Sequence, residues 1–289
     1  MIENRLFHAR YADLHLHTNF SDGTMSPEEV VIEARHVGLD AIAITDHDIL
    51  DGIEPASLAG KKHGVEVIPG IELSAEYNGE EVHMLGFYMD WQDRQFREKI
   101  SEFRDSRRIR AIKMVDKLNE LGVEIEYDDV FKQADLNSIG RPHVALALVE
   151  RGHVATRSEA FQRFLADDGP AYMPKHKLSP AEAIALILDA GGIPVLAHPG
   201  SLQQDIIPEL VSCGLMGLEA FHPQHAMELS DYYCDLARQH HILITGGSDC
   251  HGWVKDRLTI GDVRLPYEHI DALKRARKTI LQELERAAN

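Results

Sequence analysis

The stretch YADLHLHTNFSDG, residues 11–23, begins as a short apolar strand and ends in a polar loop. Side chains alternate between the two faces of a strand, so His15 and His17 point the same way. Imidazoles that converge like this are either chance neighbours on a surface or ligands of a shared metal ion. The residues at the ends of the other strands distinguish these two interpretations.

Six further strand candidates follow and alternate with helical patterns. They are AIAITDHD (41–48), EVIPGIELSA (66–75), EVHMLGFY (81–88), IPVLAHPG (193–200), GLEAFHP (217–223) and ILITGGSDCH (242–251). Ser-Pro helix starts open SPEEVVIEARHVG (26–38) and SPAEAIALILDAGG (179–192) between them. This alternation predicts an α/β fold with a mostly parallel sheet, specifically a distorted seven-stranded (β/α)7 barrel of the TIM type.

One part of the chain breaks the alternation. Between about Phe96 and Lys177 there are helical patterns but no convincing buried strand, beginning with the long basic helix FREKISEFRDSRRIRAIKMVDKLNELG (96–122). We expect residues 1–95 and 178–289 to form the barrel. Residues 96–177 would be a helical insertion between the fourth and fifth strands that caps the active site. The alternative is that these helices belong to the outer ring of the barrel.

Bulk composition excludes several classes of protein. No apolar run approaches the roughly 20 residues that span a bilayer, and the N-terminus lacks a secretory signal, so we expect a cytoplasmic protein without a membrane partner. Three cysteines without a C-x-x-C pair argue against a disulfide framework and a thiolate zinc site. A net charge of −17 disfavours long duplex DNA, though not a small or short phosphorylated substrate in a local basic pocket. The oligomeric state is left open.

Each strand carries a metal-capable side chain in or after its C-terminal half, the edge at which such barrels build their sites. The candidates are His15, His17, His47, His83, His198, His222 and His251, with the carboxylates Asp22, Asp46, Glu72 and Asp249. Each of these side chains alone could be a loop residue or a helix cap. Chance does not explain why all seven strands carry such a side chain. Imidazole and carboxylate ligands suit Mn, Fe or Zn at a hydrolytic site, and Glu72 could bridge two ions. About nine ligands predict two or three ions, because a catalytic zinc takes about three.

Cationic residues of the insertion are candidates for binding a substrate phosphate. In SIGRPHVA (138–145), Arg141 and His143 lie at a helix start, where free N–H groups and a guanidinium suit an anion; the alternative is a surface arginine. RDSRRIR (104–110) contains Arg107 and Arg108, and only one or two of its arginines are expected to face the site. Lys175 closes the insertion and would return near the barrel rim.

The motifs DLHLHTNFSDG (13–23), ITDHD (44–48), PGIELS (69–74), AHPG (197–200) and GGSDCH (246–251) resemble those of the PHP (polymerase and histidinol phosphatase) family of metal-dependent phosphoesterases. The insertion with GRPH (140–143) resembles the branch of 3′,5′-nucleoside bisphosphate phosphatases and 5′→3′ exoribonucleases acting on short RNA. The family often has histidine where Asp22 stands. The resemblance implies three ligand groups: His15, His17, Glu72 and Asp249; Glu72, His83 and His198; and Asp22, His47 and His251.

By this resemblance we expect a phosphoric monoester hydrolase that removes the 3′-phosphate from 3′,5′-bisphosphonucleosides such as 3′-phosphoadenosine 5′-phosphate. Short 5′-phosphorylated RNA is a further expected substrate, and two to three divalent ions are the expected cofactors, with Mn²⁺ ahead of Zn²⁺ or Fe²⁺. Asp249 and His222 are assigned catalytic roles, His222 as a general acid or phosphate contact unless it is structural. Asp46 is expected to orient an imidazole. The alternatives are a histidinol-phosphate phosphatase and a non-catalytic, metal-binding module associated with a polymerase.

Overall fold

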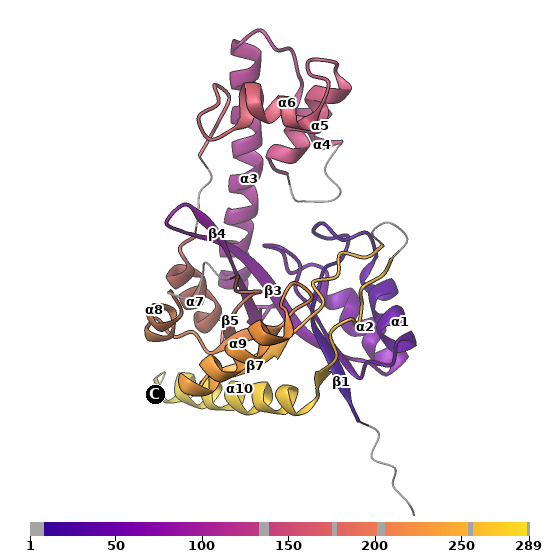
Figure 1. Ribbon diagram of the computed structural model, residues 1–289, viewed down its shortest axis with the longest axis vertical. Coiled ribbons are helices and arrows are strands. Elements are labelled where there is room, and N and C mark those ends of the chain that lie inside the picture. Colours follow the sequence, from indigo (N-terminus) through magenta and orange to yellow (C-terminus); the bar gives the residue numbers. More distant parts are fainter. Residues whose placement is uncertain (1–8, 133–138, 175–177, 201–205, 254–256, 288–289) are drawn as a thin grey trace, which may run out of the picture.

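The computed structural model describes residues 9–132, 139–174, 178–200, 206–253 and 257–287, without the side chains of residues 103–107 and 287. In this part of the chain one mixed sheet runs in the order β7-β6-β5-β4-β3-β2-β1-β8 (Figure 1). Its strands are β1 (Tyr11–Leu16), β2 (Ala41–Ile44), β3 (Glu66–Tyr77), β4 (Glu80–Phe87), β5 (Ile193–Leu196), β6 (Gly217–Phe221), β7 (Leu243–Gly246) and β8 (Leu265–Pro266). Neighbours pair in parallel, except that β4 is antiparallel to β3 and β5, and β8 to β1.

The sheet has eight strands, so the prediction of seven was wrong by one. Each of the seven predicted stretches contains a strand, and the additional strand is β8. It consists of two residues that pair with Tyr11 and Ala12 at the start of β1. Alternation of apolar and polar residues cannot be recognised over two positions, so no pattern marks this strand. The α/β barrel-like architecture itself is confirmed.

The backbone after β7 returns to the end of β1 and nearly closes the barrel. The carbonyl of Cys250 accepts the N–H of His17 at 2.9 Å. A Cβ atom at Gly247 would lie 2.2 Å from the Cβ of His15, so only glycine allows this approach. The closure therefore brings the loop that carries Asp249 against the strand that carries His15.

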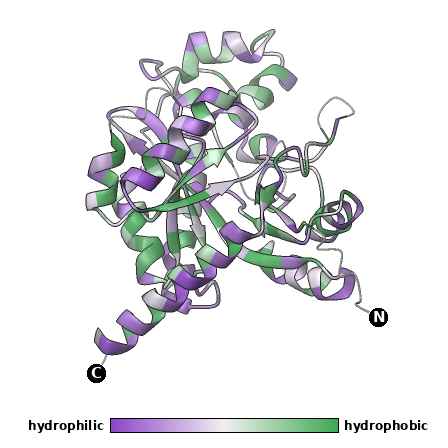
Figure 2. Ribbon diagram, turned by 60° about the horizontal axis from the view of Figure 1, so that its bottom comes forward, coloured by the Kyte–Doolittle hydropathy of each residue, from purple (hydrophilic) through white to green (hydrophobic). Residues whose placement is uncertain are grey.

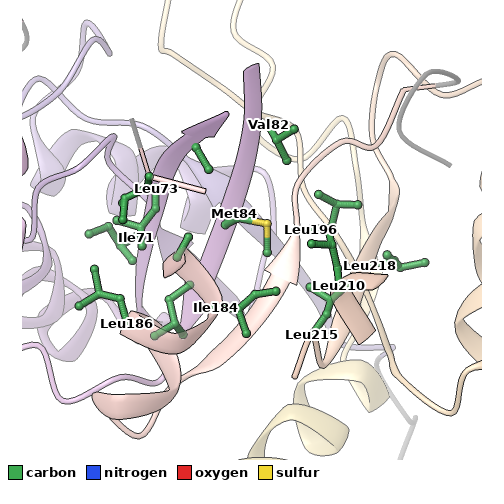
Figure 3. Close-up of a cluster of buried hydrophobic side chains, with 14 of the residues drawn as sticks. Ile71, Leu73, Val82, Met84, Ile184, Leu186, Leu196, Leu210, Leu215 and Leu218 are labelled. Atoms are coloured by element: carbon green, nitrogen blue, oxygen red, sulfur yellow. The ribbon is translucent and has the colours of Figure 1, made fainter. Parts of the chain in front are cut away.

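In the described ranges, the helices that cover the barrel are α1 (Pro27–His36), α2 (Ile53–His63), α7 (Pro180–Asp189), α8 (Ile207–Ser212), α9 (Met227–Gln239) and α10 (Glu268–Ala287). Both predicted Ser-Pro helix starts carry capping boxes, Ser26 with Glu29 and Ser179 with Glu182. Hydrophilic residues lie on the outer surfaces of the helices, whereas the strands are largely hydrophobic (Figure 2). The inner face of α7 belongs to a buried cluster that includes Ile71 and Met84 of the sheet (Figure 3).

Between β4 and α7 the described residues form helices and one isolated β-bridge, Leu178 with Ala75, but no strand. The helices are α3 (Arg94–Glu120), α4 (Tyr127–Phe131), α5 (Arg141–Glu150), α6 (Arg157–Ala160) and the π-helix η1 (Phe161–Leu165). The C-terminal half of α3 packs with the shorter helices around a separate apolar cluster that includes Met114, Leu118 and Leu148. Figure 1 shows this helical segment standing above the edge of the barrel, with α3 as its stalk. No helix within the described ranges is long and apolar enough to cross a membrane.

Candidate metal centre

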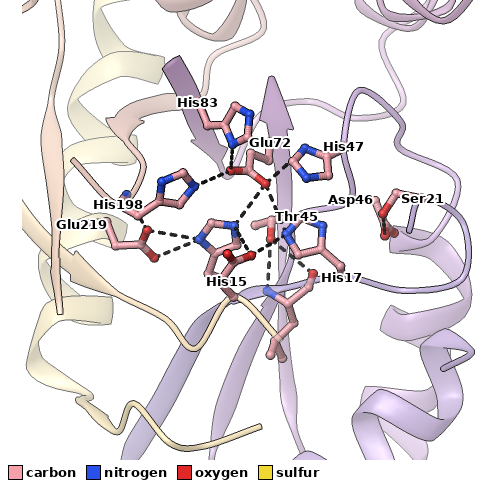
Figure 4. A network of polar contacts seen from close by, with 12 residues as sticks. His15, His17, Ser21, Thr45, Asp46, His47, Glu72, His83, His198 and Glu219 are labelled. Atoms are coloured by element: carbon pink, nitrogen blue, oxygen red, sulfur yellow. Dashed lines mark hydrogen bonds and ion pairs between the residues drawn. The ribbon is translucent and has the colours of Figure 1, made fainter. Parts of the chain in front are cut away.

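Glu72 of β3 lies at the centre of a cluster of imidazoles and is almost completely buried, with 1% of its surface exposed. Its two carboxylate oxygens face histidines from opposite sides of the barrel (Figure 4). Oε1 lies 2.9 Å from Nδ1 of His83 and 3.1 Å from Nε2 of His198, and Oε2 lies 3.2 Å from Nε2 of His15, Nε2 of His17 and Nδ1 of His47. One carboxylate thus meets five potential metal ligands.

A second carboxylate approaches the same imidazoles from the loop after β7. Asp249 has a φ of 51°, in the left-handed region that non-glycine residues rarely adopt. Its Oδ1 lies 3.1 Å from Nε2 of His17 and 3.4 Å from Nε2 of His15. The ligand atoms of His15, His17, Glu72 and Asp249 all lie within 4.8 Å of one another, close enough to surround one cation.

Two further groups of ligand atoms meet the same 4.8 Å limit. They are His17, Asp22, His47 and His251, and His47, Glu72 and His83. His47 belongs to both of these groups, because its Nδ1 faces Glu72 while its Nε2 lies 3.8 Å from Asp22. His198 contacts Glu72 but lies outside all three groups. The geometry therefore overlaps with the ligand sets that the family resemblance implies, without separating them in the same way.

Several buried polar atoms of this cluster have no hydrogen-bond partner among the described residues. Among the ligand candidates these are His15 Nε2, His17 Nδ1 and Nε2, His47 Nδ1, Glu72 Oε2 and His83 Nδ1. Buried polar atoms are normally hydrogen-bonded, and leaving them unpaired costs about 1–3 kcal/mol each. Imidazole nitrogens and carboxylate oxygens that converge without partners fit divalent cations, which would satisfy them together.

Hydrogen bonds to the outer ring nitrogens assign the tautomers of three histidines. Nδ1 of His15 donates to the carboxylate of Glu219, at 3.0 and 3.1 Å, so the neutral ring carries its lone pair on Nε2. Nδ1 of His251 donates to the carbonyl of Asp249 at 2.9 Å, with the same consequence. His222 differs, because its Nδ1 accepts the N–H of Gln224 at 3.2 Å, so neutral His222 carries its proton on Nε2.

Burial and the neighbouring charges set the protonation of the cluster. Burial alone would raise the pKa of Glu72, but the surrounding imidazoles, first that of His47, hold it well below its usual range. Burial alone would lower the pKa values of His17 and His83, but the adjacent carboxylates raise them to about 9 and about 10. At His47 burial dominates and lowers the pKa to about 4. Protons therefore compete with cations at several of these nitrogens, and cation affinity falls as the pH is lowered.

Among the described residues, the hydrogen bonds of Asp46 go to the loop after β1 and not to an imidazole, contrary to the prediction. Its carboxylate accepts hydrogen bonds from the N–H and the hydroxyl of Thr18, both at 2.7 Å. It also accepts the Ser21 hydroxyl at 2.6 Å (Figure 4). These contacts order the loop that follows β1 and carries Asp22. The side chain acts on the site through this loop rather than through the neighbouring His47.

Two buried carboxylates were not among the predicted site residues. Glu219 lies on β6 and contacts His15, and Asp13 accepts the N–H groups of Ser248 at 2.8 Å and Gly261 at 3.0 Å. Both side chains are fully buried. A signal existed for Asp13, because it precedes His15 and His17 with the same spacing of two on one strand face. Glu219 could have been noticed as an acidic residue inside the apolar strand GLEAF.

The predicted substrate-binding residues lie in different surroundings. Arg141 lines a cavity of about 130 Å³. The cavity is also lined by Arg110, Asp167 and Tyr172 of the helical segment and by Ser74 and Glu81 of the β3–β4 hairpin.

The other predicted substrate-binding residues do not line this cavity or lie outside the described residues. His143 caps α5, where its Nδ1 accepts the N–H of Gly140 at 3.0 Å. Arg108 is exposed and lies over the ring of Tyr127, 5.8 Å from its centre, rather than lining this cavity. The side chain of Arg107 and all of Lys175 lie outside the described residues.

Comparison with known proteins gives concordant matches. The model of the PHP domain matches residues 13–161. The chain is 31% identical to a phosphoribosyl 1,2-cyclic phosphate 1,2-diphosphodiesterase of Eggerthella lenta, over 83% of this chain and 94% of the relative. It is 31% identical to a 5′-3′ exoribonuclease of Haemophilus influenzae (84% and 92%) and 29% identical to a 3′,5′-nucleoside bisphosphate phosphatase of Chromobacterium violaceum (83% and 86%).

A solved structure extends these matches to the whole fold. A protein of Bifidobacterium adolescentis described as a metal-dependent phosphoesterase superposes with a TM-score of 0.72 at 33% sequence identity. The alignment covers 93% of this chain and 97% of that one. The similarity therefore includes both the barrel and the helical segment.

Proposed function

The chain belongs to the PHP family of metal-dependent phosphoesterases, and we propose that it removes the 3′-phosphate from 3′,5′-bisphosphonucleosides such as 3′-phosphoadenosine 5′-phosphate. Short 5′-phosphorylated RNA would be a further substrate. One observation carries the proposal: a cavity that contains Arg110 and Arg141, with Glu76, Glu81 and Asp167 also in its lining, lies beside the imidazole cluster around Glu72. The cluster suits the reacting phosphate and the cavity suits a second, non-reacting one.

The distance between the two features fits one nucleotide. Ser74, which lines the cavity, is two residues beyond Glu72 on β3, and Glu81 is two residues before His83 on β4. Two residues along a strand span about 7 Å. The 3′- and 5′-phosphates of a nucleoside are separated by a single ribose, so both could be held at once.

The three ligand groups would hold two or three divalent ions, and we expect Mn²⁺ ahead of Zn²⁺ or Fe²⁺. Such ions, when bound, supply a nucleophile from water near neutral pH and neutralise phosphoryl oxygens. Among the protein's own groups, His222 holds a proton on Nε2, which lies 3.6 Å from Oδ2 of Asp249. We assign this proton to the departing 3′-oxygen, with the hydrogen bond from Gln224 to Nδ1 holding the ring in place.

Arg141 would hold the 5′-phosphate. In the structure its Nη1 lies 2.5 Å from Oδ1 of Asp167 and 3.2 Å from the carbonyl oxygen of Leu165. Asp167 is 79% exposed, so its carboxylate can swing into solvent at little cost when a phosphate takes its place. The names of the relatives support this substrate class, since all three act on phosphate esters of ribose or RNA.

A panel of phosphate esters tests the proposed function. Mn²⁺-loaded protein is assayed on a 3′,5′-bisphosphonucleoside, a short 5′-phosphorylated RNA, phosphoribosyl 1,2-cyclic phosphate and histidinol phosphate. We expect the highest kcat/KM for the bisphosphonucleoside, because only this small substrate presents phosphates to both the cluster and the cavity. A higher kcat/KM for the cyclic phosphate or for histidinol phosphate would contradict the proposal.

The Arg141→Ala variant tests the role of the cavity. A charge-assisted contact contributes about 1.5–3 kcal/mol, so we expect kcat/KM to fall about ten- to a hundredfold on substrates with a 5′-phosphate. A nucleoside 3′-monophosphate, which lacks the bound group, should be a poor substrate for both proteins and show no such difference. Arg151→Ala is the matched control, because Arg151 is the C-cap of the same helix and pairs with Asp129 instead. Equal losses on both substrates would show that Arg141 serves the reacting phosphate or the fold.

A further inference from the structure

Glu219 connects two of the segments that carry imidazoles, β1 with His15 and the loop after β5 with His198. Its side chain is fully buried on β6. Both carboxylate oxygens accept from Nδ1 of His15, at 3.0 and 3.1 Å, and Oε2 also accepts the backbone N–H of His198 at 2.8 Å (Figure 4). One carboxylate thus contacts β1 and the loop after β5 together.

The two residues that Glu219 holds meet again at Glu72. Nε2 of His15 lies 3.2 Å from Oε2 of Glu72, and Nε2 of His198 lies 3.1 Å from Oε1. The rings of His15 and His198 are stacked, with their centres 5.6 Å apart and their planes at 17°. Glu219 on one side and Glu72 on the other therefore hold both residues at a defined separation.

The hydrogen bond from His198 to Glu219 also supports an unusual backbone conformation at His198. His198 has a φ of 25°, in the left-handed region that costs a non-glycine residue of order 1–3 kcal/mol. Such a conformation persists only where surrounding contacts impose it. The hydrogen bond from its N–H to the buried carboxylate is one such contact, and it directs the imidazole toward Glu72.

We propose that Glu219 is a positioning residue of the metal centre, which presets His15 as the Nδ1–H tautomer and holds His198 in its strained backbone conformation. Nε2 of His15 then faces both Glu72 and Asp249, and Nε2 of His198 lies against Oε1 of Glu72, before any cation arrives. A carboxylate on the outer nitrogen of a metal-binding histidine orients the ring and increases its basicity. The inference rests on the metal centre of the proposed function but not on its substrate.

The chemistry of the site favours glutamate over glutamine. Both neighbours of the carboxylate, Nδ1–H of His15 and N–H of His198, are hydrogen-bond donors. A glutamine amide offers one acceptor oxygen, and its NH₂ group would face the other donor. The Glu219→Gln variant therefore keeps the shape of the side chain and removes one of its two functions.

The affinity of the protein for a metal ion tests the positioning role of Glu219 without an activity assay. Metal-free protein is titrated with Mn²⁺ against a competing chelator, and we expect Glu219→Gln to bind the tightest ion 10- to 100-fold more weakly than the wild type. Glu66→Gln is the matched control. Glu66 is hydrogen-bonded to Lys274 and Tyr267 at the start of β3, where the strand lies farthest from the cluster. We expect this substitution to leave the affinity for Mn²⁺ unchanged. Equal affinities of Glu219→Gln and wild type would overturn the inference, whereas a wild type that binds no Mn²⁺ would overturn the proposed function.

The tautomer of His15 provides a test that requires no variant of Glu219. In the Zn²⁺-loaded wild type with ¹⁵N-labelled histidine, the two ring nitrogens of each imidazole have distinct chemical shifts. We expect His15 to be protonated at Nδ1 and bound to metal through Nε2. A His15 that carries its proton on Nε2 would overturn the inference, even if Glu219→Gln fails to fold.

Discussion

The Glu72→Gln variant is expected to bind at least one fewer divalent ion per chain than the wild type and to lose about three orders of magnitude in kcat/KM. The carboxylate contacts five imidazoles through two different oxygens and belongs to two of the three ligand groups. A neutral amide neither bridges two cations nor compensates their charge. Loss of an ion that neutralises phosphoryl oxygens removes several kcal/mol of transition-state stabilisation, and each 1.36 kcal/mol is tenfold in rate.

Metal analysis of protein loaded with Mn²⁺ checks the first part of this prediction, and steady-state kinetics check the second. We expect at least two ions per chain in the wild type. Glu66→Gln is again the control, because it makes the same chemical change on the same strand, β3, away from the cluster. A wild type with one ion or none, or a Glu72→Gln variant that keeps every ion, would contradict the bridging role.

The His222→Asn variant is expected to lower kcat by about 10²–10⁴-fold while its metal content stays equal to that of the wild type. His222 lies outside the three ligand groups, and the hydrogen bond from Gln224 to its Nδ1 places the proton on Nε2. This nitrogen is therefore a donor rather than a ligand. The loss should shrink sharply on an aryl phosphate, because a phenolate of low pKa departs without a proton.

His225→Asn is the matched control for this prediction. His225 lies in the same loop, with its ring centre 5.5 Å from that of His222, and its Nδ1 is hydrogen-bonded to the carbonyl of Ala220. We expect its kcat to remain near that of the wild type. Loss of an ion from His222→Asn would make His222 a ligand, and an equal loss of kcat on the aryl phosphate would remove the general-acid role.

Much of the fold could be predicted from local patterns. The spacing of two between His15 and His17, and the placement of His47 and His198 after their strands, predicted which side chains converge, because a strand repeats every two residues and parallel strands end at one edge. His83 joins them for a different reason, because it lies in the first half of β4, which is antiparallel to its neighbours. The same motifs predicted membership of the PHP family, which the comparisons confirm. The two-residue strand β8 has no such pattern and was missed.

The sequence by itself determined which residue types stand at the rim of the barrel, because strand periodicity and helix-start signals are encoded within a few neighbouring positions. Only the tertiary structure decided which of them touch: that one carboxylate, Glu72, meets five imidazoles, that His47 belongs to two groups, and that Glu219 supports His15 from below. These contacts join residues as many as 204 positions apart, such as His15 and Glu219. Their partners depend on strand order and barrel closure, and a histidine's tautomer depends on its partner, which no local pattern contains.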